Sequence, residues 1–318
     1  MVGVRRDDVF QNMSGYGLFT GGLGIHFGAE RLGCMTIPAG PGNSRRQIKL
    51  AKDFKTTVAH ILPSYALILG EHLRNMGEDP RDFPLRIAVV GAEPYTVEFR
   101  RRIEELFDMK AYNSYGLSEM NGPGVAFECQ NQNGLHVWED AYLPEIVDPK
   151  TGEPVPDGEI GEICVKGPIL ALGYYNSREK TAESFLQNPL NHAYDERIYK
   201  TGDLGHFAPD GNLMFHGRKD RQVKHLGHRV ELGEIDLAAA KVPGVEEACA
   251  LYDQEHEQIW LFYTGADVTK RDIAVALRAD LPGFMVPRKI EQLEAMPRLD
   301  NGKTDMRALA GRIADAHR

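Results

Sequence analysis

The amino-acid sequence predicts an α/β fold in which a mainly parallel sheet with helices comes first, a β-rich region second and a small α+β domain last. Three observations lead to this prediction. Short apolar runs alternate with longer amphipathic ones up to about residue 125, β-type runs occupy residues 135–215, and helical periodicity returns after residue 220. We place a domain boundary at 217–220, between an N-terminal core (1–219, β-rich over 135–216) and a mobile C-terminal domain (220–318).

The α/β region, residues 1–134, contains the apolar runs and amphipathic segments expected of strands followed by helices. We expect strands at 34–38, 58–62, 86–90 and near 110–112, with helices near 46–53, 66–76 and 96–107. The last two strands should end at Gly91-Ala92-Glu93-Pro94 and at Asn113-Ser114-Tyr115-Gly116. Because ligands bind beyond the carboxyl ends of strands in open α/β sheets, both turns are candidate sites.

The β-rich region has apolar runs at 162–165 and 213–215 and turn signals at Asp157-Gly158 and Asp210-Gly211, so we expect hairpins in a distorted barrel or small sheet. The α+β region should contain helices near 234–241, 269–280 and 304–316 and strands near 246–252 and 258–264.

Composition narrows the class of partner. With 318 residues and 42% hydrophobic content the chain can bury a sizeable core. The 37 basic and 46 acidic residues give a net charge of -9, which argues against nucleic-acid or anionic membrane partners. Small molecules or proteins are favoured as partners, and a homodimer is compatible with the sequence.

The cysteines and the N-terminal residues indicate a cytoplasmic protein. Cys34, Cys129, Cys164 and Cys249 lie far apart without a CxxC pair, so neither a disulfide framework nor a cysteine-rich zinc site is expected. The charged N-terminus leads into no long apolar segment, which argues against secretion and membrane spanning. Cys129 and His136 could ligate a metal, but two ligands alone more often pack or are solvated.

Four motifs occur in an order typical of one superfamily. They are Asn113-Ser114-Tyr115-Gly116-Leu117-Ser118-Glu119, Tyr199-Lys200-Thr201-Gly202-Asp203, Gly217-Arg218-Lys219-Asp220 through Glu234, and Leu281-Pro282 through Asn301-Gly302-Lys303. With these motifs the chain resembles the adenylate-forming enzymes, which include acyl-CoA synthetases, aryl-CoA ligases and peptide-synthetase adenylation domains. The resemblance covers essentially the whole chain.

Within this superfamily the two halves resemble different branches. The first half is similar to phenylacetate-CoA ligase at Tyr16-Gly17-Leu18-Phe19-Thr20-Gly21-Gly22, Gly91-Ala92-Glu93-Pro94, Gly122-Pro123-Gly124-Val125 and Leu135-His136-Val137-Trp138-Glu139-Asp140. The second half is more similar to an amino-acid adenylation domain. The family also has a Ser/Thr/Gly-rich phosphate loop ending in lysine, upstream of the segment that here begins at Met1. The resemblance therefore implies a truncated adenylate-forming N-terminal domain, either because a fragment is missing or because part of the catalytic apparatus is lost.

The resemblance implies an ATP-dependent, AMP-forming carboxylate-CoA ligase that adenylates an aryl acid such as phenylacetate and transfers the acyl group to CoA. The implied substrates and cofactors are ATP, Mg²⁺, CoA and a small carboxylic acid. Two alternatives stay open. The first alternative is a truncated, non-catalytic remnant that binds nucleotide or CoA. The second is an amino-acid adenylation domain that loads a carrier protein.

Several residues match the family's catalytic positions. Two anionic reactants must meet, so the site has to neutralise phosphate charge. By resemblance, Lys303 bridges the carboxylate and the α-phosphate from an exposed Asn-Gly turn, and Glu119 holds Mg²⁺, a cation that prefers oxygen ligands. Asp220 is the hinge whose rotation replaces the Lys303 face by the face that carries Gly227, His228 and Arg229 for the thiol step.

The remaining matches concern the nucleotide and the acyl group. Tyr115 would stack on adenine, Ser118 would contact the α-phosphate, Asp203 would accept hydrogen bonds from the ribose and Arg218 would add a contact to ribose or phosphate. The implied nucleotide and acyl sites also include Gly91, Ala92, Glu93, Asn113, Ser114, Gly116, Tyr16, Phe19 and Tyr65. Their aromatic and small side chains suit a flat aryl acid, although core packing explains each of the lining residues equally well. An amino-acid substrate would need a buried acid, for which Glu93 is a weak match.

Overall fold

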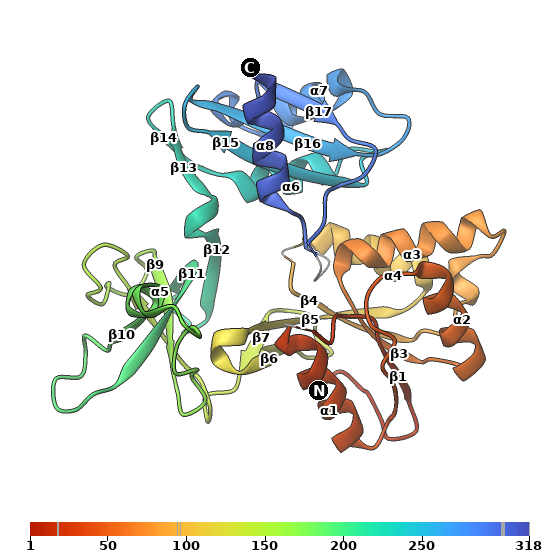
Figure 1. Cartoon of the computed structure of the whole chain (residues 1–318), viewed down its shortest axis with the longest axis horizontal. Helices are drawn as coiled ribbons and strands as arrows, with labels where there is room; N and C mark the ends of the chain where they lie inside the picture. The colour runs from red at the N-terminus through yellow and green to blue at the C-terminus, as the bar shows by residue number, and fades with distance from the viewer. Residues whose placement is uncertain (18, 94, 96, 300–302, 318) are drawn as a thin grey trace. The chain divides into compact units, whose positions relative to one another are not determined.

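The computed structural model describes residues 1–17, 19–93, 95, 97–299 and 303–317 (Figure 1). The chain divides into two compact units. The first unit comprises Met1–Ser118, Gly122–His136 and Ile235–Arg318, and the second comprises Glu119–Asn121 and Val137–Glu234. None of the helices in the described part of the chain is long and apolar enough to cross a membrane.

A seven-stranded sheet dominates the N-terminal part of the first unit, with the order β2-β1-β3-β4-β5-β6-β7. Strands β2 to β5 pair in parallel, whereas β6 pairs antiparallel with β5. The predicted mainly parallel sheet is confirmed. The strands are β1 Val9–Asn12, β2 Met35–Ile37, β3 Val58–Ile61, β4 Ile87–Gly91, β5 Lys110–Leu117, β6 Gly122–Glu128 and β7 Leu135–Val137.

Helices cover both faces of this sheet (Figure 1). Helices α2 (Ser44–Phe54), α3 (Pro63–Asn75) and α4 (Val97–Phe107) pack on one face through a core that includes Ala88 and Val90. Helix α1 (Thr20–Leu32) packs on the other face, where Ile87 contributes to the core. Ile87 and Ala88 contribute to cores on opposite faces because successive side chains of a strand point to opposite sides of the sheet. Both faces of this sheet are buried.

The sequence prediction missed β1 and α1, although it found α2, α3 and α4. The glycine-rich run 14–24 hid the start of α1, because glycine is a poor helix former. In the structure Gly22 is required by packing, since a Cβ there would lie 1.9 Å from the carbonyl oxygen of Gly15. Helix α1 ends at Gly33, whose φ of 100° suits a left-handed C-cap.

A second correction concerns residues 113–116. The sequence predicted a turn there after a strand near 110–112, and this prediction was wrong, because β5 continues to Leu117. Antiparallel pairing with β6, in which Ser114 lies opposite Phe127 and Tyr115 opposite Ala126, extends the strand. The extension is a long-range effect that local patterning does not show.

The C-terminal part of the first unit contains a three-stranded sheet in which β16 pairs antiparallel with β15 and parallel with β17. The predicted helices and strands are confirmed to within a few residues, and β17 was missed. The elements are α6 Leu232–Ala240, β15 Glu247–Asp253, β16 Gln258–Thr264, α7 Lys270–Asp280, η4 Gly283–Met285, β17 Lys289–Gln292 and α8 Met306–Ala316. A capping box between Thr269 and Asp272 sets the start of α7.

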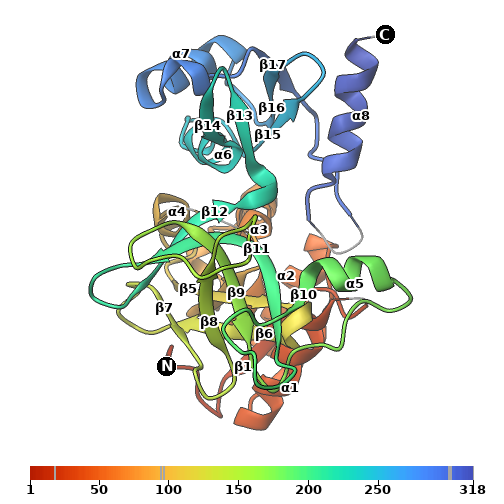
Figure 2. The same ribbon diagram turned by 90° about the vertical axis from the view of Figure 1, so that its left-hand side faces the viewer.

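The second unit is built on a small antiparallel sheet with the order β10-β11-β9-β8, to which β12 adds on β11 (Figure 2). Of the two predicted alternatives, this is the small sheet. The turn at Asp210-Gly211 joins β11 to β12, and Gly211 has a φ of 83°. The elements are β8 Leu143–Val147, β9 Gly161–Lys166, α5 Arg178–Ser184, β10 Phe185–Gln187, β11 Arg197–Phe207 and β12 Leu213–Arg218.

The second unit ends in a 3-10 turn, η3 (Lys219–Arg221), and a hairpin of β13 (Gln222–His225) and β14 (His228–Glu231). At the hairpin tip Leu226 and Gly227 have φ values of 50° and 83°. Two positive φ angles are typical of a two-residue type I′ turn, so glycine at 227 has a backbone reason. The domain boundary at 217–220 stays a prediction.

Candidate functional site

The candidate site at the end of β4 depends on close backbone approach. Gly91 lies opposite Ser114 of β5, and a Cβ at position 91 would lie 2.4 Å from the carbonyl oxygen of Ser114. Ala92 follows with a φ of 67°, an unusual value for a residue that is not glycine. The chain thus turns sharply at the carboxyl edge of the sheet, where the sequence predicted a ligand site.

Glu93 connects this turn to the start of α3. Its carboxylate accepts hydrogen bonds from the backbone N of Ser64 at 3.2 Å and from the Ser64 hydroxyl at 3.0 Å. Burial raises the pKa of Glu93, and the two Ser64 hydrogen bonds act in the opposite direction. Next to Ser64, the hydroxyl of Tyr65 lies 3.1 Å from Oγ of Ser44. Pro94 lies outside the described residues.

The end of β5 brings two of the predicted site residues, Asn113 and Gly116, close to strand β6. The backbone N of Asn113 donates to Oε2 of Glu128 at 2.7 Å. A Cβ at Gly116 would lie 2.5 Å from the carbonyl oxygen of Gly122, so β6 excludes any larger side chain there. Tyr115, between them, is half-buried.

Helix α1 supplies a contact to this region that sequence reasoning missed. The hydroxyl of Thr20 donates to Oγ of Ser118 at 3.1 Å, across 98 residues of sequence. Two predicted acyl-pocket residues precede this helix. The hydroxyl of Tyr16 lies 3.0 Å from Nδ1 of His26, and Phe19 occupies the N-cap position. That Tyr16, Phe19 and Tyr65 line one pocket stays a prediction.

In the second unit the structure brings together three predicted residues from two motifs. Arg218 donates from Nη1 to Oδ1 of Asp203 at 3.0 Å and from Nε to Oδ1 of Asp220 at 2.9 Å. The side chain of Asp203 is 5% exposed, that of Arg218 is 42% exposed and that of Asp220 is 68% exposed. One guanidinium thus joins the predicted ribose carboxylate to the predicted hinge residue.

An irregularity in β11 produces this arrangement. Asp203 pairs with Arg218 of β12, and the register shifts between Asp203 and Gly205. Such bulges redirect side chains. Gly202 has a φ of 76°, and a Cβ there would lie 2.9 Å from Nη2 of Arg218. The glycine of the Thr-Gly-Asp motif therefore leaves room for the guanidinium.

Glu119, the predicted Mg²⁺ ligand, is held by a tyrosine that sequence reasoning did not single out. The hydroxyl of Tyr174 donates to Oε1 of Glu119 at 2.8 Å and lies 3.5 Å from the hydroxyl of Tyr199. Tyr199 is buried, and burial raises its pKa. Burial also raises the pKa of Tyr174, so both tyrosines stay protonated near neutral pH and Tyr174 can act as a hydrogen-bond donor.

The residues predicted for the thiol step lie on the β13–β14 hairpin. Gly227 is at its tip, exposed His228 begins β14, and Arg229 pairs through its backbone with Lys224. Lys303 is exposed in the first unit, and its carbonyl oxygen accepts a 2.8 Å hydrogen bond from the backbone N of Leu299. Asn301 and Gly302, which were predicted to present Lys303, lie outside the described residues.

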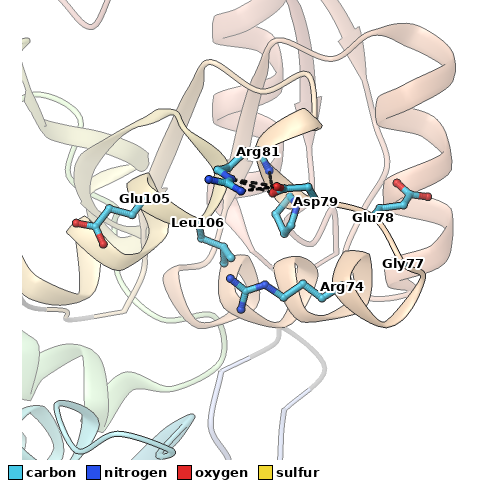
Figure 3. Close-up of a pocket in the computed structure, with 8 residues that line it drawn as sticks. Arg74, Gly77, Glu78, Asp79, Arg81, Glu105 and Leu106 are labelled. Carbon is cyan, nitrogen blue, oxygen red and sulfur yellow. Dashed lines mark hydrogen bonds and ion pairs between the residues drawn. The ribbon is translucent and has the colours of Figure 1, made fainter.

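One concave surface of about 620 Å³ involves none of the predicted site residues (Figure 3). It lies beside the carboxyl ends of α3 and α4, with Arg74 and Glu105 among its lining residues. Asp79 and Arg81 form a pair there with 2.6 Å between Oδ2 and Nη2, and the Arg81 hydrogen bonds lower the pKa of Asp79 to about 2. A helix that connects two parallel strands ends beside the amino end of the second strand. This surface therefore lies at the amino ends of the strands, whereas Gly91 lies at the carboxyl end of β4.

Comparison with known proteins identifies similar sequences. The family described as AMP-binding enzyme matches residues 3–175. A phenylacetate-coenzyme A ligase of Pseudomonas putida is 49% identical over 183 residues, which are 56% of this chain and 42% of the relative. Gramicidin S synthase 2 of Brevibacillus brevis is 33% identical over 273 residues, which are 82% of this chain and 6% of the synthase. The chain spans less than half the length of either relative.

Solved structures show the same fold. The anthranilate CoA ligase AuaEII in complex with anthranoyl-AMP has a TM-score of 0.81 and 21% identity, covering 99% of this chain and 62% of that chain. A benzoate CoA ligase from Burkholderia xenovorans LB400 has a TM-score of 0.79 and 21% identity, covering 96% of this chain and 62% of that chain. These likenesses confirm the predicted fold of adenylate-forming enzymes.

Proposed function

The chain belongs to the AMP-binding enzyme family, and we propose that it acts as an AMP-forming ligase that joins an aryl acid such as phenylacetate to CoA. The observation that carries the proposal is the 49% identity over 183 residues with the phenylacetate-coenzyme A ligase of Pseudomonas putida. The free thiols of all four cysteines agree with a reducing, cytoplasmic location.

The proposed reaction has two steps. In the first, a carboxylate oxygen of the acid attacks the α-phosphorus of ATP, pyrophosphate leaves and an acyl adenylate forms. In the second, the sulfur of CoA attacks the acyl carbon, its proton passes to solvent and AMP leaves. Because the reactants of the first step are both anionic, a cation must lie between them, and exposed Lys303 is the residue that we assign to this role.

The nucleotide contacts that we propose draw support from the geometry of the second unit. Asp203 has two carboxylate oxygens for the ribose hydroxyls, and its hydrogen bond from Arg218 orients the group. The partly exposed guanidinium of Arg218 has further N–H donors for ribose or phosphate oxygens. Tyr115 and Ser118 are proposed to contact adenine and the α-phosphate.

Glu119 fits a role as a Mg²⁺ ligand. Its Oε1 is oriented by the Tyr174 hydroxyl, and a carboxylate is the kind of hard oxygen donor that Mg²⁺ prefers. When bound, Mg²⁺ supplies charge neutralisation to the phosphates of ATP. The protein's own contribution is the orientation of the carboxylate.

For the second step we propose that Asp220 is the hinge and that Gly227, His228 and Arg229 face the CoA thiol. Asp220 lies in η3, between the sheet of the second unit and the β13–β14 hairpin, and its side chain is exposed. An exposed position between two regular elements can absorb a backbone rotation without disrupting a core.

A second candidate function is amino-acid adenylation with transfer to a carrier protein. It is favoured by the 82% of this chain that aligns with gramicidin S synthase 2. An amino-acid substrate would require a carboxylate for its ammonium group. Glu93 is the candidate for that role, but its carboxylate is already bonded to Ser64. Nη1 of Arg298 also lies 3.6 Å from Oε1 of Glu93, so a cation already faces this carboxylate, which favours the aryl acid.

The test is carboxylate-dependent exchange of pyrophosphate into ATP, measured with a panel of aryl and amino acids. Exchange with an aryl acid should disappear in Lys303→Ala and persist in Lys270→Ala, a control at the exposed start of α7. Free CoA and a phosphopantetheinylated carrier are then offered together. Thioester formation on the carrier alone would identify the second function, and ATP binding without any exchange would identify a non-catalytic remnant.

A further inference from the structure

We propose that Asp253, His256 and His317 form a binding site for a divalent transition-metal ion such as Zn²⁺. None of the three is among the residues proposed for the AMP-forming reaction. Among the residues that the structure describes, they are the group of three potential metal ligands whose donor atoms lie within 4.8 Å of one another. Two imidazoles and one carboxylate are a donor set that binds zinc well.

Both imidazoles point at the same carboxylate oxygen. Nδ1 of His256 lies 2.9 Å from Oδ2 of Asp253, and Nε2 of His317 lies 2.8 Å from that oxygen. Zinc bonds to nitrogen and oxygen are about 2.0–2.2 Å long, so ligand atoms of one ion lie roughly 3–4 Å apart. A metal ion would replace the two shared protons, and the stacked rings, whose planes are 11° apart, would turn so that each nitrogen lone pair meets the ion.

The fold orients the carboxylate in advance. Asp253 is the last residue of β15, and its Oδ1 accepts hydrogen bonds from the backbone N of Glu255 at 3.1 Å and of His256 at 3.2 Å. These bonds form the tight turn toward β16 and leave Oδ2 for the two imidazoles and for Gln258, whose Nε2 donates to it at 3.4 Å. Support of this kind behind a ligand is typical of metal sites.

The third ligand comes from a distant part of the chain. His317 follows the last turn of α8, 64 residues after Asp253. Its ring stacks on that of His256 with 3.7 Å between centroids, and the edge of Trp260 packs against it at 5.8 Å. These contacts hold the ring of His317 beside Asp253 and His256.

Burial gives the cluster a closed inner side and an open outer side. The side chain of Asp253 is 7% exposed, whereas those of His317 and His256 are 25% and 40% exposed. A buried carboxylate requires a compensating cation or several donors. The more exposed imidazoles leave an entry path and a coordination position for water, which is the arrangement of an open zinc site.

The alternative is a hydrogen-bonded tie that fastens α8 to the β15–β16 turn without any metal. The two interpretations differ in what His256 does. His256→Gln leaves the Asp253–His317 hydrogen bond in place, so a simple tie would survive, whereas a metal site would lose a ligand. His192→Gln is the matched control, because His192 is an exposed histidine outside the cluster.

The experiment is titration of the chelator-treated full chain with Zn²⁺ by calorimetry. We expect one ion per chain with micromolar or tighter affinity, a loss of roughly tenfold or more in His256→Gln and in His317→Gln, and unchanged affinity in His192→Gln. Circular dichroism without metal verifies that each variant is folded. Failure of the wild-type chain to bind micromolar Zn²⁺, or equal binding by wild type and both cluster variants, would overturn the proposal.

A second measurement reports the coordination itself. Co²⁺ bound by two imidazoles and a carboxylate absorbs visible light far more strongly than hexaaqua Co²⁺. We expect this absorption in the wild-type chain and in His192→Gln, and its loss in His256→Gln. Retention of the full absorption in His256→Gln would also contradict the assignment.

Discussion

Tyr174 donates a 2.8 Å hydrogen bond from its hydroxyl to Oε1 of Glu119. The same segment reaches the backbone of this residue, since the N of Ala171 donates to the carbonyl oxygen of Glu119 at 2.8 Å. Two contacts across more than fifty residues of sequence therefore decide where this carboxylate lies. In the role that we propose for Glu119 as a Mg²⁺ ligand, these two contacts would orient the carboxylate.

Tyr174→Phe removes the hydroxyl but keeps the ring. We expect the free energy of unfolding to fall by about 1–3 kcal/mol, since a hydrogen bond to a charged group is lost. The measurement is urea denaturation. Tyr175→Phe is the matched control, because the side chain of Tyr175 is fully exposed, and it should change stability by less than about 0.5 kcal/mol. Equal effects of the two substitutions would show that the Tyr174 contact contributes nothing.

The Arg218–Asp203 pair should show energetic coupling. In a double-mutant cycle of Arg218→Gln and Asp203→Asn we expect a coupling energy of about 1 kcal/mol, reduced from that of a fully buried pair because Arg218 is partly exposed. Unfolding by urea supplies the four free energies. A parallel cycle with Asp210→Asn, an exposed residue of the β11–β12 turn, should give a coupling near zero.

Gly91→Ala should be destabilising because of the close approach of β5. The added Cβ would lie 2.4 Å from the carbonyl oxygen of Ser114, and we expect a loss of about 1–3 kcal/mol in the free energy of unfolding. Gly28→Ala is the control. Position 28 lies within α1 with nothing within 4 Å of a new Cβ, so alanine should stabilise the chain by up to about 1 kcal/mol. A neutral Gly91→Ala in thermal or urea melts would refute the steric argument.

His60 should make stability depend on pH. Burial lowers the pKa of His60 to about 4, and its Nδ1 lies 3.0 Å from Oδ1 of Asn12. Since the unfolded chain has a histidine pKa near 6.5, it binds more protons than the folded chain between about pH 4 and 6.5. Stability is therefore expected to fall as the pH is lowered through this window, by at most a few kcal/mol at about 1.4 kcal/mol per pKa unit.

The pH prediction is tested by comparing denaturation curves of wild type and His60→Gln at several pH values. The glutamine variant should lack this part of the acid sensitivity, so the stability gap between the two proteins should narrow toward pH 4. His192→Gln, at an exposed position, should retain the wild-type profile. Parallel pH profiles for wild type and His60→Gln would contradict the proposed origin of the effect.

Much of the fold could be predicted from local pattern. Helices α2, α3 and α4 and strands β3 and β4 carry their own periodicity, because each buries one face or both faces of a regular element. Helix α1 could not be recognised this way. Its glycines look like a loop in sequence, and their reason, such as the close contact of Gly22 with Gly15, exists only in the packed chain.

The same division applies to the candidate site. The motifs pointed to Glu119, Asp203, Arg218 and Asp220 as site residues, and their roles stay predictions. The motifs did not include Tyr174, and they included Thr20 without indicating its contact with Ser118, because each of these residues acts on a partner more than fifty residues away.

Periodicity was sufficient for the fold class and for most of the helices, and the order of the motifs was sufficient for the family. Only the tertiary structure decided that Arg218 joins Asp203 to Asp220, that β5 extends through residues 113–116, and that Asp253 meets two histidines. The physical reason is the separation along the chain of the residues that interact. Secondary structure follows from side chains a few positions apart, whereas hydrogen bonds between distant segments form only after the hydrophobic core has fixed where those segments lie.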